Sequence, residues 1–339
     1  MNDVIWPKVI FGTSGLGNLY VAQSDAAKLA IVEACVRHSE RQVIFDSAGK
    51  YGAGLALECL GKSLRQLRVK PEDVMISNKL GWLRTELKTP EPTFEPGIWR
   101  DLKFDAVQQI SYNGIIACYE QGNELLNGYK AGLVSVHDPD EYIDKGQSHA
   151  EREKLYIDVL DAYRALHDLK QQKEVKAIGI GSKNWRVIEK IANDVDLDWV
   201  MIANSMTVHS HPPELVAFME KLKDKGIAII NSAVFNGGFL IGSDYYNYRP
   251  VDPASEPELY QWRASFYELC AAYELQPAKV CAGFGLKAPG VVSIALNTTN
   301  QKRVAQNVAM AAVEIPMDFW ADMKVRRLMD YACSFIGNI

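Results

Sequence analysis

The chain has 339 residues, of which 48% are apolar and 23% are charged, and its formal net charge is −5. This composition excludes a disordered or fibrous chain, and it offers no basic surface for nucleic acid or anionic lipid. Six cysteines without a Cys-x-x-Cys pair disfavour a disulfide scaffold or a structural zinc site. With no secretory signal pattern and no apolar run near the ~20 residues of a membrane span, we expect a cytoplasmic protein with no membrane partner.

Short runs of largely β-branched residues recur along the chain and predict strands. Each run has four to seven residues and is almost continuously apolar, which is typical of strands covered on both faces in a parallel sheet. The predicted strands are residues 9–12, 43–47, 74–79, 133–137, 177–182, 199–205, 227–233 and 291–296.

Segments with a 3.6-residue apolar period separate these runs and predict helices. They include residues 151–172, the segment that follows Pro212 and Pro213, and the segment around Leu60 and Leu64. Eight strands alternating with helices, at about 42 residues per unit, predict a single (β/α)8 TIM barrel domain over residues 1–339. A doubly wound sheet would need only about six strands and a separate second domain.

Three segments do not fit the repeating unit. Residues 81–103 and 242–257 are too long for ordinary connections and carry several prolines and aromatic residues. Both follow a strand end, so we expect long loops on the C-terminal face of the barrel, where barrel enzymes keep their active sites. Residues 317–333 predict an extra C-terminal helix outside the eight units.

Polar side chains of complementary chemistry stand at the ends of three consecutive predicted strands. Asp46 ends the second strand, and Tyr51 follows five residues later. Lys79 ends the third strand and His137 ends the fourth. Because the carboxyl ends of barrel strands meet at one rim, we expect these four residues to form a catalytic site.

The chemistry of this set indicates proton transfer. A neighbouring ammonium favours a phenolate, so Lys79 is expected to lower the pKa of Tyr51 from its usual value of about 10. Asp46 would balance the charge of Lys79, and His137 would orient a substrate oxygen. The set contains no obvious electron acceptor, so a redox reaction would need a bound cofactor.

These residues and several longer motifs resemble the aldo-keto reductase superfamily and its Asp-Tyr-Lys-His tetrad. Within it, the chain is similar to the D-threo-aldose 1-dehydrogenases, the group that contains L-fucose and L-galactose dehydrogenases. The motifs are Gly-Thr-Ser-Gly-Leu-Gly-Asn-Leu-Tyr at 12–20, Asp-Ser-Ala-Gly-Lys-Tyr-Gly at 46–52, His-Asp-Pro-Asp at 137–140, Ala-Ile-Gly-Ile-Gly at 177–181, and Val-Phe-Asn-Gly-Gly-Phe-Leu at 234–240.

The resemblance implies an NAD(P)-dependent oxidoreductase that oxidises an aldose at its anomeric carbon to a lactone, or reduces an aldehyde or ketone in reverse. Tyr51 would be the general base, and the cofactor would lie extended over the barrel mouth. Thr13 and Ser14 would lie near it, and Ser182 and Asn204 would meet the nicotinamide carboxamide. The residues expected to wrap the pyrophosphate are Phe235, Asn236, Gly237, Gly238 and Leu240, with Phe235 also stacking on the nicotinamide.

Residues 297–307, which include Thr298, resemble the adenosine-binding segment of the family. Asn307 and Gln306 would contact adenine, and Arg303 would lie over its ring. Relatives that prefer NADP often carry a lysine where this chain has Asn297, and phosphate binding depends on paired positive charge. The resemblance therefore favours NAD, while the cations nearby leave NADP open.

The remaining candidates and alternatives stay open at this point. Trp82 and Tyr246 lie in the long rim loops and are candidates for contact with a small sugar or aldehyde substrate. His209 and His211 lack an evident third ligand, so no metal site is expected. A Schiff-base aldolase that uses Lys79, or a cofactor-binding regulatory subunit, are the alternative functions. No apolar stripe is left to demand a partner, so we expect a monomer or a weak homo-oligomer.

Overall fold

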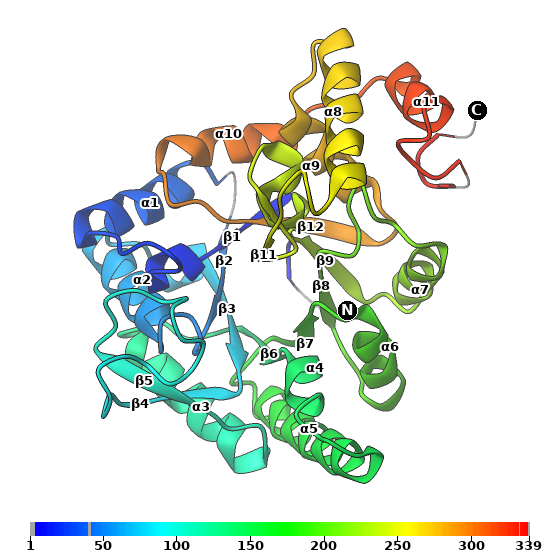
Figure 1. The fold of residues 1–339 in the computed structure, drawn as a ribbon. Helices are drawn as coiled ribbons and strands as arrows, with labels where there is room; N and C mark the ends of the chain where they lie inside the picture. The colour runs from blue at the N-terminus through cyan, green and yellow to red at the C-terminus, as the bar shows by residue number, and fades with distance from the viewer. Residues whose placement is uncertain (1–3, 40–41, 332, 338–339) are drawn as a thin grey trace.

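The structure is a computed structural model, and it describes residues 4–39, 42–331 and 333–337. Eight parallel strands close into a barrel that helices surround (Figure 1), which confirms the predicted (β/α)8 fold. In order around the barrel, the strands are β1 (Val9–Gly12), β12 (Val291–Leu296), β9 (Ala228–Ser232), β8 (Trp199–Ala203), β7 (Ala177–Ser182), β6 (Leu133–His137), β3 (Val74–Leu80) and β2 (Val43–Ala48). All eight predicted strands are present.

The helices begin and end with ordinary capping and turn residues. For example, Ser148 and Glu151 form a reciprocal capping box at the start of α5. The α-helices are α1 (Asp25–Arg37), α2 (Leu55–Gln66), α3 (Tyr112–Leu125), α4 (Pro139–Ile143), α5 (His149–Gln171), α6 (Trp185–Asp194), α7 (Pro213–Asp224), α8 (Pro257–Ala272), α9 (Pro277–Lys287), α10 (Lys302–Met310) and α11 (Met317–Val325). Short 3-10 helices are η1 (Ser14–Gly17), η2 (Pro71–Asp73) and η3 (Asn236–Ile241).

The inside of the barrel is filled by apolar side chains that lie below the polar strand ends. Successive strand residues point to opposite faces, so Ile44, Met75 and Leu133 share the inner face with the polar residues that follow them on β2, β3 and β6. The largest is Trp199 of β8, which is fully buried and lies 6.5 Å from Trp6 between ring centres. The polar rim of the barrel therefore rests on a packed apolar layer.

The two long connections contain short antiparallel hairpins, which the sequence did not indicate. Strand β4 (Trp82–Glu86) opens the first connection and pairs with β5 (Phe104–Gln108), which lies just beyond it. Strands β10 (Tyr245–Tyr246) and β11 (Arg249–Pro250) pair within the second. The irregular stretch between β4 and β5 runs back to the barrel mouth, where Leu19 forms a β-bridge with Trp99.

The C-terminal helix is shorter than predicted, because it ends at Val325 instead of continuing to residue 333. Arg327 has a positive φ of 56°, which turns the chain out of the helix. The Lys324 ammonium then donates to the carbonyl oxygens of Cys333, Ile336 and Gly337, and this holds the chain end against the last turn. Among the described residues, no helix combines the length and apolar character needed to cross a membrane.

The close contact between β7 and the Trp199 ring generates a stability prediction. A Cβ added at Gly179 would lie 2.3 Å from the Trp199 ring, and the barrel interior leaves that ring no room to move. We expect Gly179→Ala to lower the free energy of unfolding by about 2 kcal/mol, measured by urea denaturation.

Trp199→Leu provides the matched background, because the smaller side chain removes the two ring atoms that the new Cβ would meet, while the carbonyl oxygen of residue 199 stays 2.5 Å away in both backgrounds. Gly179→Ala should therefore lower the free energy of unfolding by less in this background, since neighbouring substitutions are coupled in a double-mutant cycle. An equal cost in both backgrounds would contradict the packing argument.

Candidate active site

The four residues of the predicted tetrad come together at the C-terminal rim of the barrel. The Lys79 Nζ lies 2.5 Å from the Asp46 Oδ2, and both side chains are buried. The same nitrogen lies 4.9 Å from the centre of the Tyr51 ring. The His137 ring meets the Tyr51 ring edge-on at 5.6 Å between centres. A phenol, an ammonium, a carboxylate and an imidazole therefore line one small space.

The turn that carries Tyr51 is held by a close approach of two backbone segments. A Cβ at Gly17 would lie 2.8 Å from the Tyr51 carbonyl, and a Cβ at Gly52 would lie 2.3 Å from the Gly17 carbonyl oxygen. Gly52 also has a positive φ of 63°, which glycine adopts without strain. The glycine-rich stretch near the N-terminus therefore packs η1 against the catalytic turn and brings Ser14 to the mouth.

Two opposing effects set the proton affinity of Tyr51. Burial of the phenol raises its pKa, and the Lys79 ammonium lowers it through its charge and a side-chain hydrogen bond. Burial is the larger effect, so the pKa of Tyr51 rises from 10.0 to about 12. Lys79 acts in the expected direction, but the net shift is opposite to the expectation. Tyr51 is therefore a protonated donor at neutral pH.

Lys79 and His137 are held in fixed protonation states. Burial lowers the pKa of Lys79, but its interactions with the Asp46 carboxylate and then with Tyr51 outweigh burial, so the pKa of Lys79 lies above the usual value. Burial, followed by the charges of Lys50 and Lys79, lowers the pKa of His137 well below 6.5. Lys79 is thus a stable cation, unsuited to attack a carbonyl as a Schiff-base nucleophile, and His137 is a neutral imidazole.

The tetrad opens into a mouth cavity of about 290 Å³. Besides Tyr51, its wall contains three aromatic rings, and the Trp99 ring lies 5.9 Å from the Tyr51 ring between centres. It also contains a group of charged side chains on the side of His137. The aromatic residues are Tyr20, Trp99 and Tyr248, and the charged ones are Lys50, Glu95, Asp138 and Lys183.

The charged group is an ion-pair network around Lys50. The Lys50 Nζ lies 2.8 Å from Glu95, 3.1 Å from Glu141 and 3.6 Å from Asp138. The Asp138 carboxylate also lies 3.5 Å from the His137 Nε2, which ties the network to the tetrad. The sequence reasoning missed these residues, although Lys50 precedes Tyr51 and Asp138 follows His137 directly.

Two further cavities continue from the mouth and form a groove across the barrel. The second, of about 550 Å³, shares Ser14 and Tyr51 with the mouth cavity. The third, of about 820 Å³, shares Phe235 and Asn297 with the second. The groove carries predicted cofactor residues from one end to the other, namely Ser14, Ser182, Phe235, Gly237, Gly238, Asn297, Thr298, Arg303, Gln306 and Asn307.

The residues along the groove fit an extended dinucleotide. Asn204 and Asn236 lie outside the walls of the three cavities, and the buried side-chain oxygen of each has no hydrogen-bond partner among the described residues, so each retains a free acceptor beside the groove loops. Gly237 and Gly238 have φ values of 74° and 98°, a conformation that lets the loop backbone approach a phosphate closely, although the Gly238 N–H itself donates to the Phe235 carbonyl oxygen. Ser182 lines the mouth, whereas Asn184 caps α6.

Some predicted binding residues lie outside the walls of the three cavities. Thr13 is buried and donates to the Asp46 carbonyl oxygen and the Ser47 hydroxyl, and Leu240 is fully buried in the core. Trp82 packs against Phe94, and its ring centre lies 5.5 Å from the Nζ of Lys50, which lines the mouth in its place.

Tyr246 turns away from the mouth because its hydroxyl lies 2.9 Å from the His209 Nδ1. Its neighbour Tyr248, on the same hairpin, lines the mouth instead. His211 is also engaged: its Nδ1 lies 3.1 Å from the Thr207 carbonyl oxygen, and its Nε2 accepts the backbone N–H of Asp330.

Comparison with known proteins places the chain in a family. The model of the aldo/keto reductase family matches residues 8–325, so the chain belongs to that family. It is 28% identical to a pyridoxal 4-dehydrogenase of Microbacterium luteolum, over 94% of this chain and 93% of that one. It is 27% identical to a D-threo-aldose 1-dehydrogenase of a Pseudomonas species, over 95% and 94%.

Solved structures of low sequence identity share the fold. An aldo-keto reductase from Bacillus halodurans superposes with a TM-score of 0.69 at 17% identity, over 98% of this chain and 95% of that one. A glycerol dehydrogenase from Gluconobacter oxydans gives a TM-score of 0.69 at 14% identity, over 96% and 93%. The protein is thus an NAD(P)-dependent oxidoreductase that acts on a small molecule.

Removal of the Tyr51 hydroxyl tests the role of the tetrad. We expect Tyr51→Phe to lower turnover by about 10²- to 10⁴-fold, the usual contribution of a positioned acid or base. Cofactor affinity, measured by fluorescence titration, should stay within about twofold because the groove is unchanged. Tyr331→Phe, at an exposed tyrosine outside the site, is the control. Turnover near that of the control would refute the assignment.

The raised pKa of Tyr51 predicts different pH profiles for the two directions. Oxidation needs the phenolate, so its rate should climb by up to about tenfold per unit between about pH 7 and 9, while reduction uses the protonated phenol and stays level. Lys79→Met removes the charge that lowers the pKa of Tyr51, so the oxidation profile should move to higher pH. An oxidation rate independent of pH in this range would contradict the prediction.

Proposed function

We propose that the protein is an aldose 1-dehydrogenase that oxidises the anomeric carbon of a sugar to a lactone with NAD. The observation that carries this proposal is the mouth cavity, where the tetrad meets both aromatic rings and a network of charged side chains. A sugar ring has apolar C–H faces that pack against aromatic rings. Its hydroxyl groups need hydrogen-bond partners of the kind that Asp138, Glu95 and Lys50 offer.

The tetrad supplies the proton chemistry for this reaction. A dinucleotide held in the groove would supply the hydride acceptor for oxidation and the hydride donor for reduction. His137, neutral and buried, positions the substrate oxygen by a hydrogen bond. Tyr51 takes the hydroxyl proton in oxidation and gives it back in reduction, and the Lys79 charge stabilises the phenolate that forms. Asp46 keeps Lys79 in place through the ion pair.

The preference for NAD rests on the adenosine end of the groove. Asn297 is neutral there, and its amide donates to the Ser14 hydroxyl at 2.6 Å. A 2′-phosphate would require paired positive charge at this end. Arg303 and Lys279 also line this cavity and are the side chains that a 2′-phosphate would contact. Direct titration with NADH and NADPH therefore decides the cofactor, and we expect tighter binding of NADH.

A substrate panel tests the proposed reaction. L-fucose, L-galactose, D-glucose and pyridoxal are assayed with saturating NAD and NADP, and the products are identified by mass spectrometry. We expect at least one aldose to be oxidised to its lactone with a kcat/KM at least about tenfold above that of pyridoxal, a difference of about 1.4 kcal/mol. Pyridoxal is included because a similar protein is a pyridoxal 4-dehydrogenase. A clear preference for pyridoxal would overturn the proposal.

A further inference from the structure

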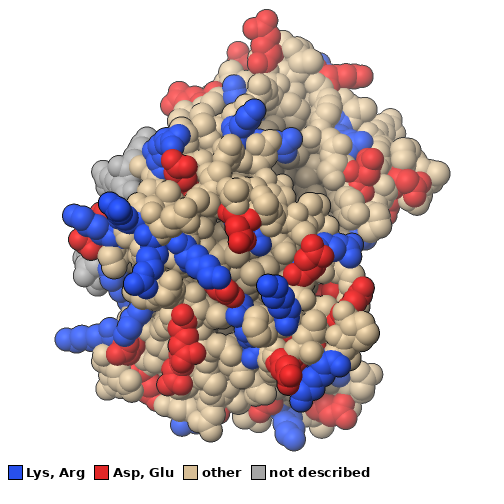
Figure 2. Space-filling model, turned by 90° about the vertical axis from the view of Figure 1, so that its left-hand side faces the viewer, with Lys and Arg blue, Asp and Glu red and all other residues tan. Residues whose placement is uncertain are grey.

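A second groove lies on the outer wall of the barrel, away from the mouth. It has a volume of about 380 Å³ and lies between α1, α2 and the segment around residues 101–104. It shares no lining residue with the mouth cavity. Figure 2 shows the side of the molecule on which α1 and α2 lie in Figure 1, and a band of Lys and Arg side chains runs across it from one edge toward the centre.

The unusual residue of this groove is Lys28. It lies on the buried face of α1 with Ile31, Val32 and Cys35, in positions that a helix packed on a barrel normally fills with apolar side chains. Lys28 is only 4% exposed as a residue, and its ammonium, which opens onto the groove, has no hydrogen bond or ion pair with any described residue. A lysine that is largely buried without a partner for its charge is costly, so its presence on this face needs an explanation.

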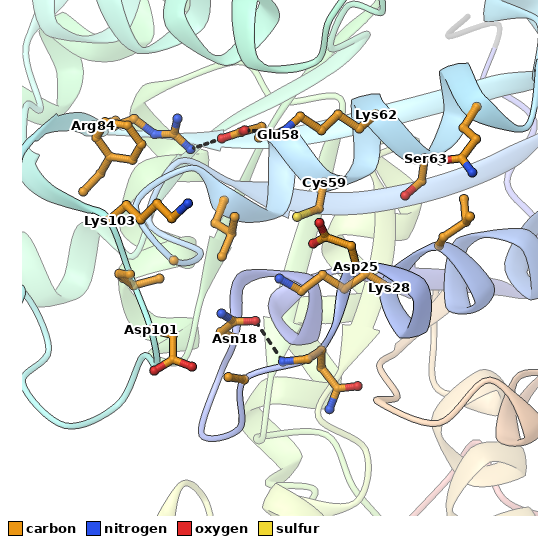
Figure 3. Close-up of a pocket in the computed structure, with 18 residues that line it drawn as sticks. Asn18, Asp25, Lys28, Glu58, Cys59, Lys62, Ser63, Arg84, Asp101 and Lys103 are labelled. Atoms are coloured by element: carbon orange, nitrogen blue, oxygen red, sulfur yellow. Dashed lines mark hydrogen bonds and ion pairs between the residues drawn. The ribbon is translucent and has the colours of Figure 1, made fainter.

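Figure 3 shows where the Lys28 ammonium points. The side chain leaves α1 and extends into the open space of the groove, and Lys103 extends toward the same space from the opposite wall. Two cations on facing walls, one of them buried, favour an anion between them. Apolar side chains, among them Leu29, Leu55 and Phe104, line the same groove and can cover an organic body.

The carboxylates of the groove do not neutralise Lys28. Glu58 is paired with Lys62 at 2.7 Å and with Arg84 at 3.0 Å. Burial alone would raise the pKa of Glu58, but these two cations hold it below its usual range, so it stays ionised and engaged. Asp25 lies one turn before Lys28 on α1, and Figure 3 shows its carboxylate near Cys59, but it is exposed to solvent and forms no ion pair with Lys28. Asp101 is also exposed, so solvent and salt screen it.

The neighbouring thiol does not supply the missing charge either. Cys59 lines the groove close enough to Lys28 to feel its charge, but burial raises the pKa of the thiol above its usual value. A protonated thiol carries no charge, so it cannot balance the Lys28 ammonium. The Lys28 ammonium therefore faces the groove without an ion-pair partner among the described residues.

We propose that this groove is a binding site for a small organic phosphate, whose phosphoryl group lies between Lys28 and Lys103. A phosphate monoester carries nearly two negative charges and three acceptor oxygens, which suits two ammonium groups on facing walls. The volume of the groove exceeds what a bare phosphate fills and lies within the range of ligand pockets. Gly52, the residue after the catalytic tyrosine, lines the groove, so the ligand would lie behind the catalytic turn.

The test uses the enzyme saturated with cofactor, so that the dinucleotide groove cannot take up the probe. Inorganic phosphate and glycerol 3-phosphate are titrated by calorimetry and by thermal unfolding, against sodium chloride at equal ionic strength. We expect one site per chain, tighter binding of glycerol 3-phosphate than of inorganic phosphate, and an affinity about tenfold lower in Lys28→Met. Lys28→Arg should keep the affinity within about threefold, because it keeps the charge.

The unliganded variant separates binding from a structural role. Methionine suits the buried face of α1, so Lys28→Met should unfold at the same temperature as the wild type or higher when no phosphate is present. Lys154→Met, which removes an exposed lysine of α5, is the control and should bind like the wild type. No binding to the wild type, or equal binding to the wild type and Lys28→Met, would overturn the proposal.

Discussion

The buried ion pair between Asp46 and Lys79 is the constraint on which the active site depends. Each charge would be costly alone at the end of a packed barrel, and each is tolerated because the other lies 2.5 Å away. The register of β2 and β3 fixes this distance, since Asp46 pairs with Ser77 and Ala48 pairs with Lys79. The two strands therefore cannot slip without breaking the pair.

The same enclosure creates a conflict at Tyr51. Burial strengthens the effect of the Lys79 charge, but it also penalises the phenolate, and the penalty is the larger of the two. Burial acts on His137 in the opposite sense, because it favours the neutral imidazole. One physical cause thus keeps both residues uncharged in the free enzyme. Tyr51 can ionise only to the extent that the positive charges of Lys79 and of a bound nicotinamide would compensate for the cost of burying the phenolate.

The parts of the molecule that depend on local pattern could be predicted from the sequence. Continuous apolar runs gave the barrel strands, and the polar residue at each strand end gave the tetrad, because a parallel barrel forces those ends together. The walls of the mouth could not be found in this way. Trp99 faces the mouth through a bridge to Leu19, and Tyr248 does so with a positive φ of 68°. These are loop contacts between distant segments, which no periodicity records.

Trp82 and Tyr246 show that sequence position also predicts contacts that the structure does not contain. Both stand in rim loops, as a substrate-contacting residue would, but a strand pairing and a contact with His209 turn them away from the mouth. The position of a residue in a rim loop therefore predicts proximity to the site and not contact with it. Contact depends on which side chain the loop turns inward, and that is decided by tertiary packing.

Lys79, Lys50 and Lys28 are all buried, but they differ in whether the protein supplies a carboxylate that balances their charge. Lys79 has Asp46 and Lys50 has three carboxylates, so both charges are balanced within the protein. Lys28 is equally buried and has no such partner among the described residues. An apolar residue would pack better at that position of α1, so stability gives no reason for a lysine there. An anion that entered the groove would supply the partner that Lys28 lacks, so its binding would offset the free-energy cost of burying the lysine.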